Sequence, residues 1–158
     1  MFKEIRRKSR ELTGERVNEL LRTTEYGFLS LGSSVNGYAY GIPINYAYDD
    51  ETNSLYFHGA TEGQKLDEIR QNGKVSFCIV GRTQPLPDKF STIYESVIAF
   101  GEASIIDNDE EKRKALRLLV RKYSIDFEQI GEEYMDKSWD KIDTFKIHIQ
   151  HMTAKARY

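Results

Sequence analysis

A strand-to-helix junction at residues 56–66 has the composition of an anion-binding site. The segment reads YFHGATEGQKL, so a predicted strand ends near Gly59, and Lys65 lies in the first turn of a predicted helix after Gly63. Backbone N–H groups at a helix start lack intrahelical partners and attract anions. Lys65 adds a positive charge and Thr61 a hydroxyl group. The spacing fits neither the nucleoside-triphosphate loop nor the dinucleotide fingerprint. The residues alone leave two interpretations open, a phosphate cradle and an ordinary turn with a solvated lysine.

Three histidines could supply acid–base or metal chemistry. His58 ends the predicted strand beside the candidate cradle. There it could donate to a phosphate or carbonyl oxygen, or serve as a proton donor near neutral pH, although a lone strand histidine is usually structural. His148 and His151 follow a strand-like alternation, which predicts that they point to opposite faces. We therefore expect no metal site.

Other catalytic patterns are missing from the sequence. Nothing resembles the nucleophile elbow of hydrolases, and the acidic groups at 49–51 and 107–111 fit a turn and a helix start. The lone cysteine, Cys78, excludes an intrachain disulfide and a multi-cysteine zinc site. Because it lies in the apolar run VSFCIV, we expect it in the core.

Residues 38–48 predict a strand with one face of large side chains and one face of small ones. Small residues such as Ala39, Gly41 and Pro43 alternate with large ones, which a period of two places on opposite faces. The small face lets a flat molecule approach, while the large face packs a core. Pro43 lacks an N–H, so the strand is an edge or is bulged. The large residues are Tyr38, Tyr40, Ile42, Ile44, Tyr46 and Tyr48.

The remaining elements predict a mainly β domain with flanking helices. Mostly antiparallel strands with short links favour a small barrel of six or so strands with helices at its ends. Strands are expected at 28–31, 38–48, 54–60, 74–80, 94–106 (bent at Gly101) and 143–150, with a hairpin turn at 33–37. Helices are expected between Thr13 and Gly27, at 63–72 and from Asn108 to Lys122, with a helix or structured loop at 126–137 and a long loop at 81–93.

Composition fits one folded domain spanning residues 1–158. Hydrophobic residues make up 39% and charged residues 30% of the chain, and the charged segment 1–12 is expected to form an arm or a frayed helix. A net charge of −2 gives no support for nucleic-acid binding. Apolar runs are too short to cross a membrane, and the N-terminus lacks the apolar stretch of a secretory signal, so we expect a cytoplasmic protein.

Four segments together resemble a known superfamily. YGIPINYAYD, LYFHGATEGQKLDEI, YESVIAFGEASIID and the terminal HMTAKA are similar, in the same order, to the flavin-binding split-barrel superfamily. Within it, the chain resembles the nitroimidazole-resistance reductases related to pyridoxamine 5′-phosphate oxidase. This resemblance implies a six-stranded antiparallel split β-barrel, a homodimer, and flavin mononucleotide (FMN) at the subunit interface.

The resemblance also implies roles for individual residues. Lys65 would bind the phosphate, surrounded by His58, Gly59, Ala60 and Thr61. The edge of the isoalloxazine ring would lie along Pro43, Ile44 and Asn45. Ser96 and Tyr94, from the Y-x-S-V motif, would lie near the phosphate or ribityl chain, and Lys155 would reach the flavin from the partner subunit.

The implied activity is that of an oxidoreductase. A reduced nicotinamide, NAD(P)H, would supply a hydride, and a small nitroaromatic or quinone-like acceptor would receive electrons. His58 is the tentative catalytic residue, and Trp139, Tyr123 and Tyr134 are expected to line the substrate face.

Departures from the pattern keep other functions open. The chain lacks the arginine-rich C-terminal segment of pyridoxamine phosphate oxidase, so vitamin B6 chemistry is not expected, and Ala154 stands where the family often has glycine. The alternatives are a haem-binding split-barrel protein that uses one of the three histidines, a non-catalytic flavin-binding module, and an interaction domain without a ligand.

Overall fold

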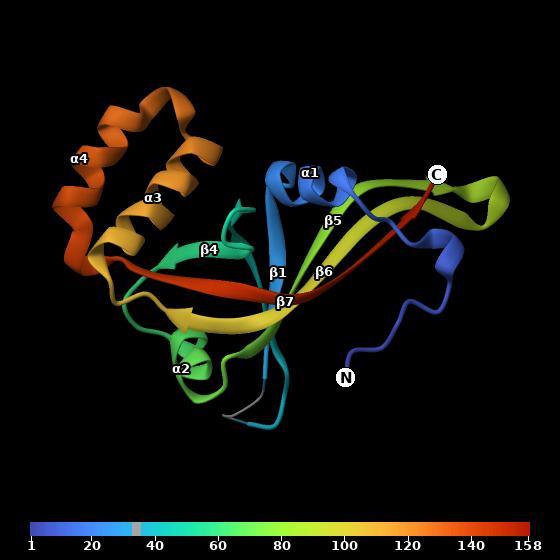
Figure 1. Cartoon of the computed structure of the whole chain (residues 1–158), viewed down its shortest axis with the longest axis horizontal. Helices are drawn as coiled ribbons and strands as arrows, with labels where there is room; N and C mark the ends of the chain where they lie inside the picture. The colour runs from blue at the N-terminus through green and yellow to red at the C-terminus, as the bar shows by residue number, and fades with distance from the viewer. Residues whose placement is uncertain (33–35) are drawn as a thin grey trace.

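The computed structural model describes residues 1–32 and 36–158 and consists mainly of one antiparallel sheet. Seven strands follow the order β2-β1-β5-β6-β7-β4-β3 (Figure 1). Their bounds are β1 (Tyr26–Leu31), β2 (Tyr40–Asn45), β3 (Ala47–Asp49), β4 (Ser54–Gly59), β5 (Lys74–Leu86), β6 (Ser91–Ile105) and β7 (Asp143–Arg157). The antiparallel, mainly β architecture confirms the predicted fold class.

The two edges of the sheet are joined through a single residue. β2 ends at Asn45 and β3 begins at Ala47, yet these strands lie at opposite edges. Tyr46, between them, is fully buried and donates its hydroxyl to the Leu21 carbonyl at 2.7 Å. The hydrogen-bond ladder is therefore not closed, although the chain itself connects the edges. The single strand expected over 38–48 breaks where it changes partners, which gives seven strands instead of six.

Side chains along β2 alternate as predicted. Ile42 and Ile44 pack on the main core while Gly41 and Pro43 are exposed, but Tyr38 lies outside the strand and is 78% exposed. β2 is an edge strand, which explains how it tolerates a proline.

Aromatic rings fill the centre of the core. The rings of Phe57 and Phe145 stack with centroids 4.7 Å apart, and Phe77 meets Phe57 edge-on at 5.3 Å. A Cβ at Gly27 would lie 2.4 Å from the Phe77 ring, so glycine is required there. The expectation that Gly27 ends the first helix is wrong: the helix ends at Thr23, and Gly27 belongs to β1.

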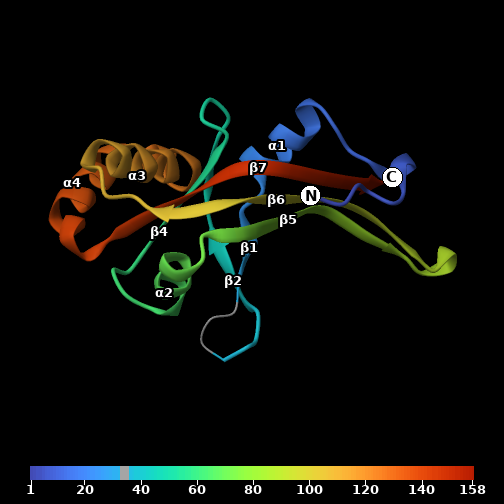
Figure 2. The ribbon, with the colours of Figure 1, turned by 60° about the horizontal axis from the view of Figure 1, so that its bottom comes forward.

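The segment expected to be a loop, 81–93, is a β-hairpin. β5 and β6 stay paired out to Leu86 and Ser91, after a register shift between Val80 and Thr83. Figure 2 shows this hairpin extending away from α3 and α4. Pro85 is accommodated because β1 pairs with β5 only as far as Cys78, so the outer part is a two-stranded ribbon.

Four α-helices flank the sheet, namely α1 (Glu15–Thr23), α2 (Gln64–Gln71), α3 (Asp109–Tyr123) and α4 (Glu128–Ser138). Asn108 caps α3 by accepting the Glu111 N–H at 2.8 Å, as predicted, and the segment 126–137 is mostly α4. α3 and α4 lie together at one end of the sheet (Figure 1). Among the described residues, each helix is too short or too polar to cross a membrane.

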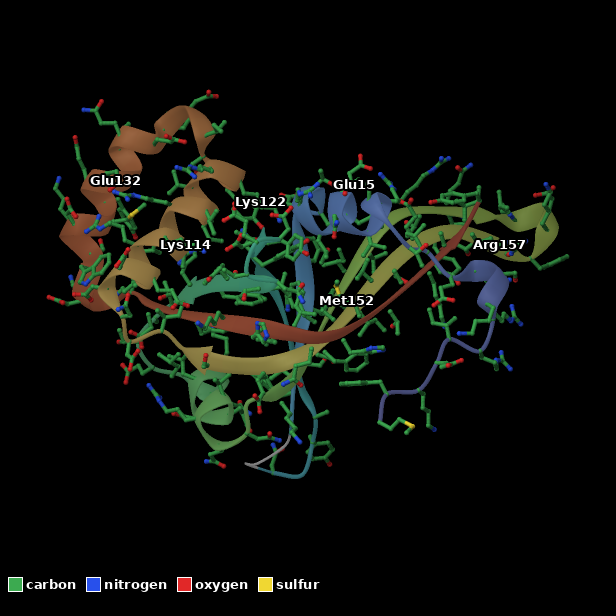
Figure 3. All side chains as sticks on the ribbon, viewed as in Figure 1. Glu15, Lys114, Lys122, Glu132, Met152 and Arg157 are labelled. Carbon is green, nitrogen blue, oxygen red and sulfur yellow. The ribbon has the colours of Figure 1, made fainter. Side chains whose placement is uncertain are left out.

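Polar contacts hold the end of α3 against the corner at Tyr46. The Lys122 ammonium donates to the carbonyls of Thr24 at 2.7 Å and Tyr46 at 3.0 Å. Figure 3 shows Lys122 at the end of α3 that is nearest to α1. These contacts fix the position of the α3–α4 pair over the sheet.

β7 is longer than predicted and contains a bulge. Its register against β6 shifts between Phe100 and Gly101, so that His148 pairs with Glu102 and His151 with Phe100. Because Phe100 and Glu102 share one face of β6, both histidines lie on that face. The expectation that they point to opposite faces is therefore wrong, since one extra residue in β7 reverses the alternation. The N-terminal arm lies along this strand, where Phe2 stacks on His151 at 4.5 Å.

Candidate cofactor and substrate site

The Lys65 ammonium lies directly over the end of β4. A Cβ at Gly59 would be only 2.9 Å from Lys65 Nζ, and the same nitrogen lies 5.4 Å from the centre of the Phe145 ring. The side chain is half-buried, and this burial lowers the pKa of Lys65. Within the described ranges, no carboxylate forms an ion pair with it. A cation that is half removed from water without a counter-charge favours binding of an anion.

Backbone amides at the start of α2 add to this positive region. Gly63 precedes the helix at φ 134°, a conformation that side chains rarely adopt, and no side chain caps the helix. The first helical hydrogen bonds are those of Leu66 and Asp67 to the Gly63 carbonyl, so the earlier amides stand outside the ladder. Ala60 and Thr61 lie exposed in the connection between β4 and α2. This connection therefore presents its backbone beside Lys65.

His58 lies next to the cradle in an environment that favours its neutral form. Desolvation first, and the positive charge of Lys65 second, lower the pKa of His58 below 6.5. Across the β4–β7 pair, His58 is in register with Thr144. The buried hydroxyl of Thr144 has no hydrogen-bond partner in the described part of the chain. A neutral imidazole and an orphaned hydroxyl thus lie side by side at this end of the sheet.

The other predicted phosphate-proximal residues lie far from Lys65. Ser96 pairs with Lys155, and Tyr94 with Arg157, on the outer halves of β6 and β7. Lys155 is separated along β7 from Thr144, the partner of His58, by roughly 35 Å at about 3.3 Å per residue. Figure 3 labels Arg157 at the end of β7 opposite to α2 and the α3–α4 pair. One chain therefore does not bring Lys65 together with Ser96, Tyr94 or Lys155.

Pro43 and Asn45 share the outward face of the sheet with Ser96 and Lys155. The cross-strand row through Pro43 continues through Phe28, Cys78, Ile98 and Thr153, and the neighbouring pairs are Asn45 with Tyr26 and Ser96 with Lys155. Ile44 points the other way and packs on the core, so only its backbone can face a ligand.

Large apolar side chains stand exposed on this outward face. Tyr26 is 50% exposed, and Phe28 and Val80 are each 49% exposed. Cys78 lies in the same patch and is half-buried, so the expectation of a core cysteine is wrong. The sequence did not distinguish the two faces of β5, because both carry apolar residues.

A cavity of about 420 Å³ opens between the α3–α4 pair and the end of the sheet that carries Asn45 and His58. Asn45 and His58 line it from the sheet, and Tyr123 and Tyr134 line it from the helices, as predicted for the tyrosines. Trp139 does not line it, since its ring packs against Lys112 and Arg113 instead. Sequence reasoning missed the apolar walls from Leu116, Leu119, Val120, Phe127, Ile130 and Met135. The helical spacing of Leu116, Leu119 and Val120 was the signal available in the sequence.

Solved structures show where else this fold occurs. A candidate 5-nitroimidazole antibiotic resistance protein from Bacteroides thetaiotaomicron aligns with a TM-score of 0.71 at 22% identity, covering 90% of this chain and 83% of that one. A conserved protein from Mycobacterium tuberculosis aligns with a TM-score of 0.76 at 15% identity, covering 97% and 90%. A FAD and haem binding protein from Mycobacterium smegmatis aligns with a TM-score of 0.68 at 17% identity, covering 91% of this chain and 71% of that one. At these identities the likenesses establish the fold alone.

Sequence comparison extends the assignment from fold to family. No curated protein sequence matches the chain. The profile of the family described as pyridoxamine 5′-phosphate oxidase, however, matches residues 13–156, which covers the four α-helices and the seven strands of the described residues except for the last residue of β7. The chain therefore belongs to the pyridoxamine 5′-phosphate oxidase family.

Proposed function

We propose that the protein is an FMN-dependent oxidoreductase that passes electrons from a reduced nicotinamide to a small nitroaromatic or quinone-like acceptor. The observation that carries this proposal is the half-buried Lys65 ammonium over Gly59, which has no carboxylate partner among the described residues. A dianionic phosphate complements this cation and the open start of α2.

The residues at the cradle fit the phosphate end of a flavin. Gly59 leaves its position free of a side chain, so the Lys65 ammonium can approach the backbone there. Exposed Pro43 and Asn45 leave the outer face of β2 low enough for a flat ring. When bound, a flavin supplies hydride and single-electron chemistry that side chains do not have. The protein holds the phosphate, orients the ring and limits access of water.

His58 is the residue that we assign to the reacting end of the site. It lines the cavity and lies within the electrostatic influence of Lys65. As a neutral imidazole it can donate one hydrogen bond from a ring nitrogen to a substrate oxygen and hold a proton there. We assign it a role in orienting the substrate and in proton transfer.

The complete site requires two copies of the chain. Along β7, Lys155 lies roughly 35 Å from Thr144, which is the strand partner of His58 beside the cradle. This distance exceeds what one mononucleotide can span. Tyr26, Phe28 and Val80 also leave an apolar patch on the face that carries Ser96 and Lys155. A homodimer that buries this patch would place Ser96 and Lys155 of one chain near the cradle of the other.

Identification of the chromophore that co-purifies with the protein tests the proposal. We expect flavin absorption bands, release of FMN on denaturation, and bleaching of the bands by NADH or NADPH without oxygen. Colourless protein that takes up no FMN during dialysis would overturn the proposal.

A haem-binding protein is the second candidate, favoured by the likeness to the FAD and haem binding protein from Mycobacterium smegmatis. An axial ligand would come from His58, His148 or His151. His151 is already stacked against Phe2, which leaves His58 and the exposed His148 more accessible. A dominant Soret band in the purified protein would decide for haem.

A further inference from the structure

The cavity beneath α3 and α4 has a lining without charge. Its walls are mostly aliphatic and aromatic side chains, and the residues that line it in the described part of the chain include no Asp, Glu, Lys or Arg. Its volume of about 420 Å³ is within the usual range for small-molecule sites. The Lys65 charge reaches His58, but Lys65 does not line the cavity and is assigned to the flavin phosphate, so an ionised ligand group would lose its hydration without a counter-charge in the walls.

Four polar side chains that line the cavity, those of Asn45, His58, Ser124 and Tyr134, remain available for a ligand. Neither Asn45 nor His58 has a side-chain hydrogen bond to another described residue. The Tyr123 hydroxyl, in contrast, is already engaged, since it accepts the Tyr46 N–H and its single proton lies between the carbonyls of Glu25 and Tyr46 as acceptors. Hydrogen bonds to a ligand can therefore come from Asn45 and His58 on the sheet side of the cavity, and from Ser124 and Tyr134 on the helix side.

The mouth of the cavity is unusually apolar for a solvent-exposed segment. Phe127, Ile130 and Tyr134 line the cavity and are 59%, 62% and 63% exposed. Gly131 lets α4 approach α3 closely, since a Cβ there would lie 3.1 Å from a Val120 methyl group. Exposed apolar side chains grouped around a concave site are typical of ligand binding.

We propose that this cavity binds an uncharged, planar aromatic compound, which Asn45 and His58 orient by hydrogen bonds. Resting on the proposed function, this compound is the electron acceptor, because Asn45 also ends the strand assigned to the flavin edge. The chemistry favours neutral ring compounds with a carbonyl or nitro oxygen and excludes phosphorylated or carboxylated acceptors.

A matched pair of fluorescent dyes tests the ligand class without turnover. N-phenyl-1-naphthylamine is neutral, and 1-anilinonaphthalene-8-sulfonate has the same skeleton with one negative charge. We expect the purified, full-length protein to bind the neutral dye at least tenfold more tightly. Ile130→Glu, at an exposed position on the mouth, should weaken binding of the neutral dye at least tenfold. Phe90→Glu, at a 97% exposed position outside the cavity, should leave it unchanged. Equal affinities for the two dyes, or an Ile130→Glu variant that binds normally, would overturn the proposal.

Flavin content separates this inference from the proposed function. Ile130→Glu should retain the FMN content of the wild-type protein while the KM for 1,4-naphthoquinone rises. Loss of FMN from Ile130→Glu would mean that the cavity holds the flavin itself, which contradicts the acceptor assignment. If the wild-type protein takes up no FMN but shows the expected dye preference, the oxidoreductase proposal fails while the assignment of the ligand class stands.

Discussion

We propose Lys65 as the phosphate-binding residue because its charge is half-buried and has no acidic partner among the described residues. Lys65→Ala should weaken FMN binding about tenfold or more, since a charge-assisted hydrogen bond contributes about 1.5–3 kcal/mol. Titration of the apoprotein with FMN, followed by flavin fluorescence, measures the effect. Lys89→Ala removes the same charge at an exposed position near the hairpin tip and should bind FMN normally. Equal affinity in wild-type protein and Lys65→Ala would contradict the cradle.

His58 should titrate below the ordinary histidine value, because desolvation and the Lys65 charge both lower its pKa. In the folded protein His58 takes up its proton only at a pH below 6.5, whereas in the unfolded chain it does so near 6.5. The pKa of His58 is thus lower in the folded state than in the unfolded state. Between those two pKa values the unfolded state binds more protons, and acidification therefore destabilises the fold. NMR titration of the imidazole should give a midpoint below 6.5, and Lys65→Met should raise that midpoint. A midpoint at or above 6.5 in the wild-type protein would show that the ring is not desolvated.

At the scale of elements, a partly buried ion pair ties α1 to the base of the β5–β6 hairpin. Glu95, on β6, is only 2% exposed and accepts hydrogen bonds from Arg16 Nε at 2.9 Å and Nη2 at 2.7 Å. The Tyr158 hydroxyl donates to the same carboxylate at 2.8 Å. These contacts, with Arg16 first among them, lower the pKa of Glu95 to about 2.

This carboxylate should make the fold sensitive to acid. Because its pKa is lowered from 4.5 to about 2, its contribution is present above pH 4.5 and is lost as the pH falls toward 2. A shift of this size corresponds to about 3 kcal/mol of unfolding free energy. Urea unfolding at several pH values should show that the free energy of unfolding falls more steeply below pH 4.5 in wild-type protein than in Glu95→Gln. Identical slopes would show that Glu95 is not linked to folding in this way.

At the scale of the whole molecule, we propose that a second copy covers the apolar patch of Tyr26, Phe28 and Val80. Phe28→Glu places a charge in the middle of this patch at a position that is 49% exposed, so the monomer should still fold. We expect sedimentation velocity to show a dimer for wild-type protein and a monomer for Phe28→Glu. The FMN content of Phe28→Glu should also fall, because in the monomer Ser96 and Lys155 no longer approach the cradle of another chain. Ile125→Glu, on the helical side and 62% exposed, is the matched control and should remain dimeric. A wild-type monomer at micromolar concentration would contradict the two-chain site.

Local patterns in the sequence determined the elements and the cradle. The alternation at 40–45, the Asn108 cap and the glycine before α2 all act within a few residues, and the structure follows them. His58, Gly59 and Lys65 come together because the chain turns directly from β4 into α2. Adjacency in sequence was therefore enough to place these three residues beside one another.

Only the tertiary structure decided the features that depend on distant strands. Strand register placed Ser96 and Lys155 far from Lys65, and the β7 bulge set His148 and His151 on one face. The extended hairpin at 81–93 also depends on pairing, because its residues bond to another strand and not to their neighbours. The cavity exists because α3 and α4 pack beside the end of the sheet that carries Asn45 and His58, and no pattern in the sequence predicted this packing. Hydrogen-bond register and helix docking are set by contacts between segments far apart in the chain, and a periodic pattern within one segment does not encode them.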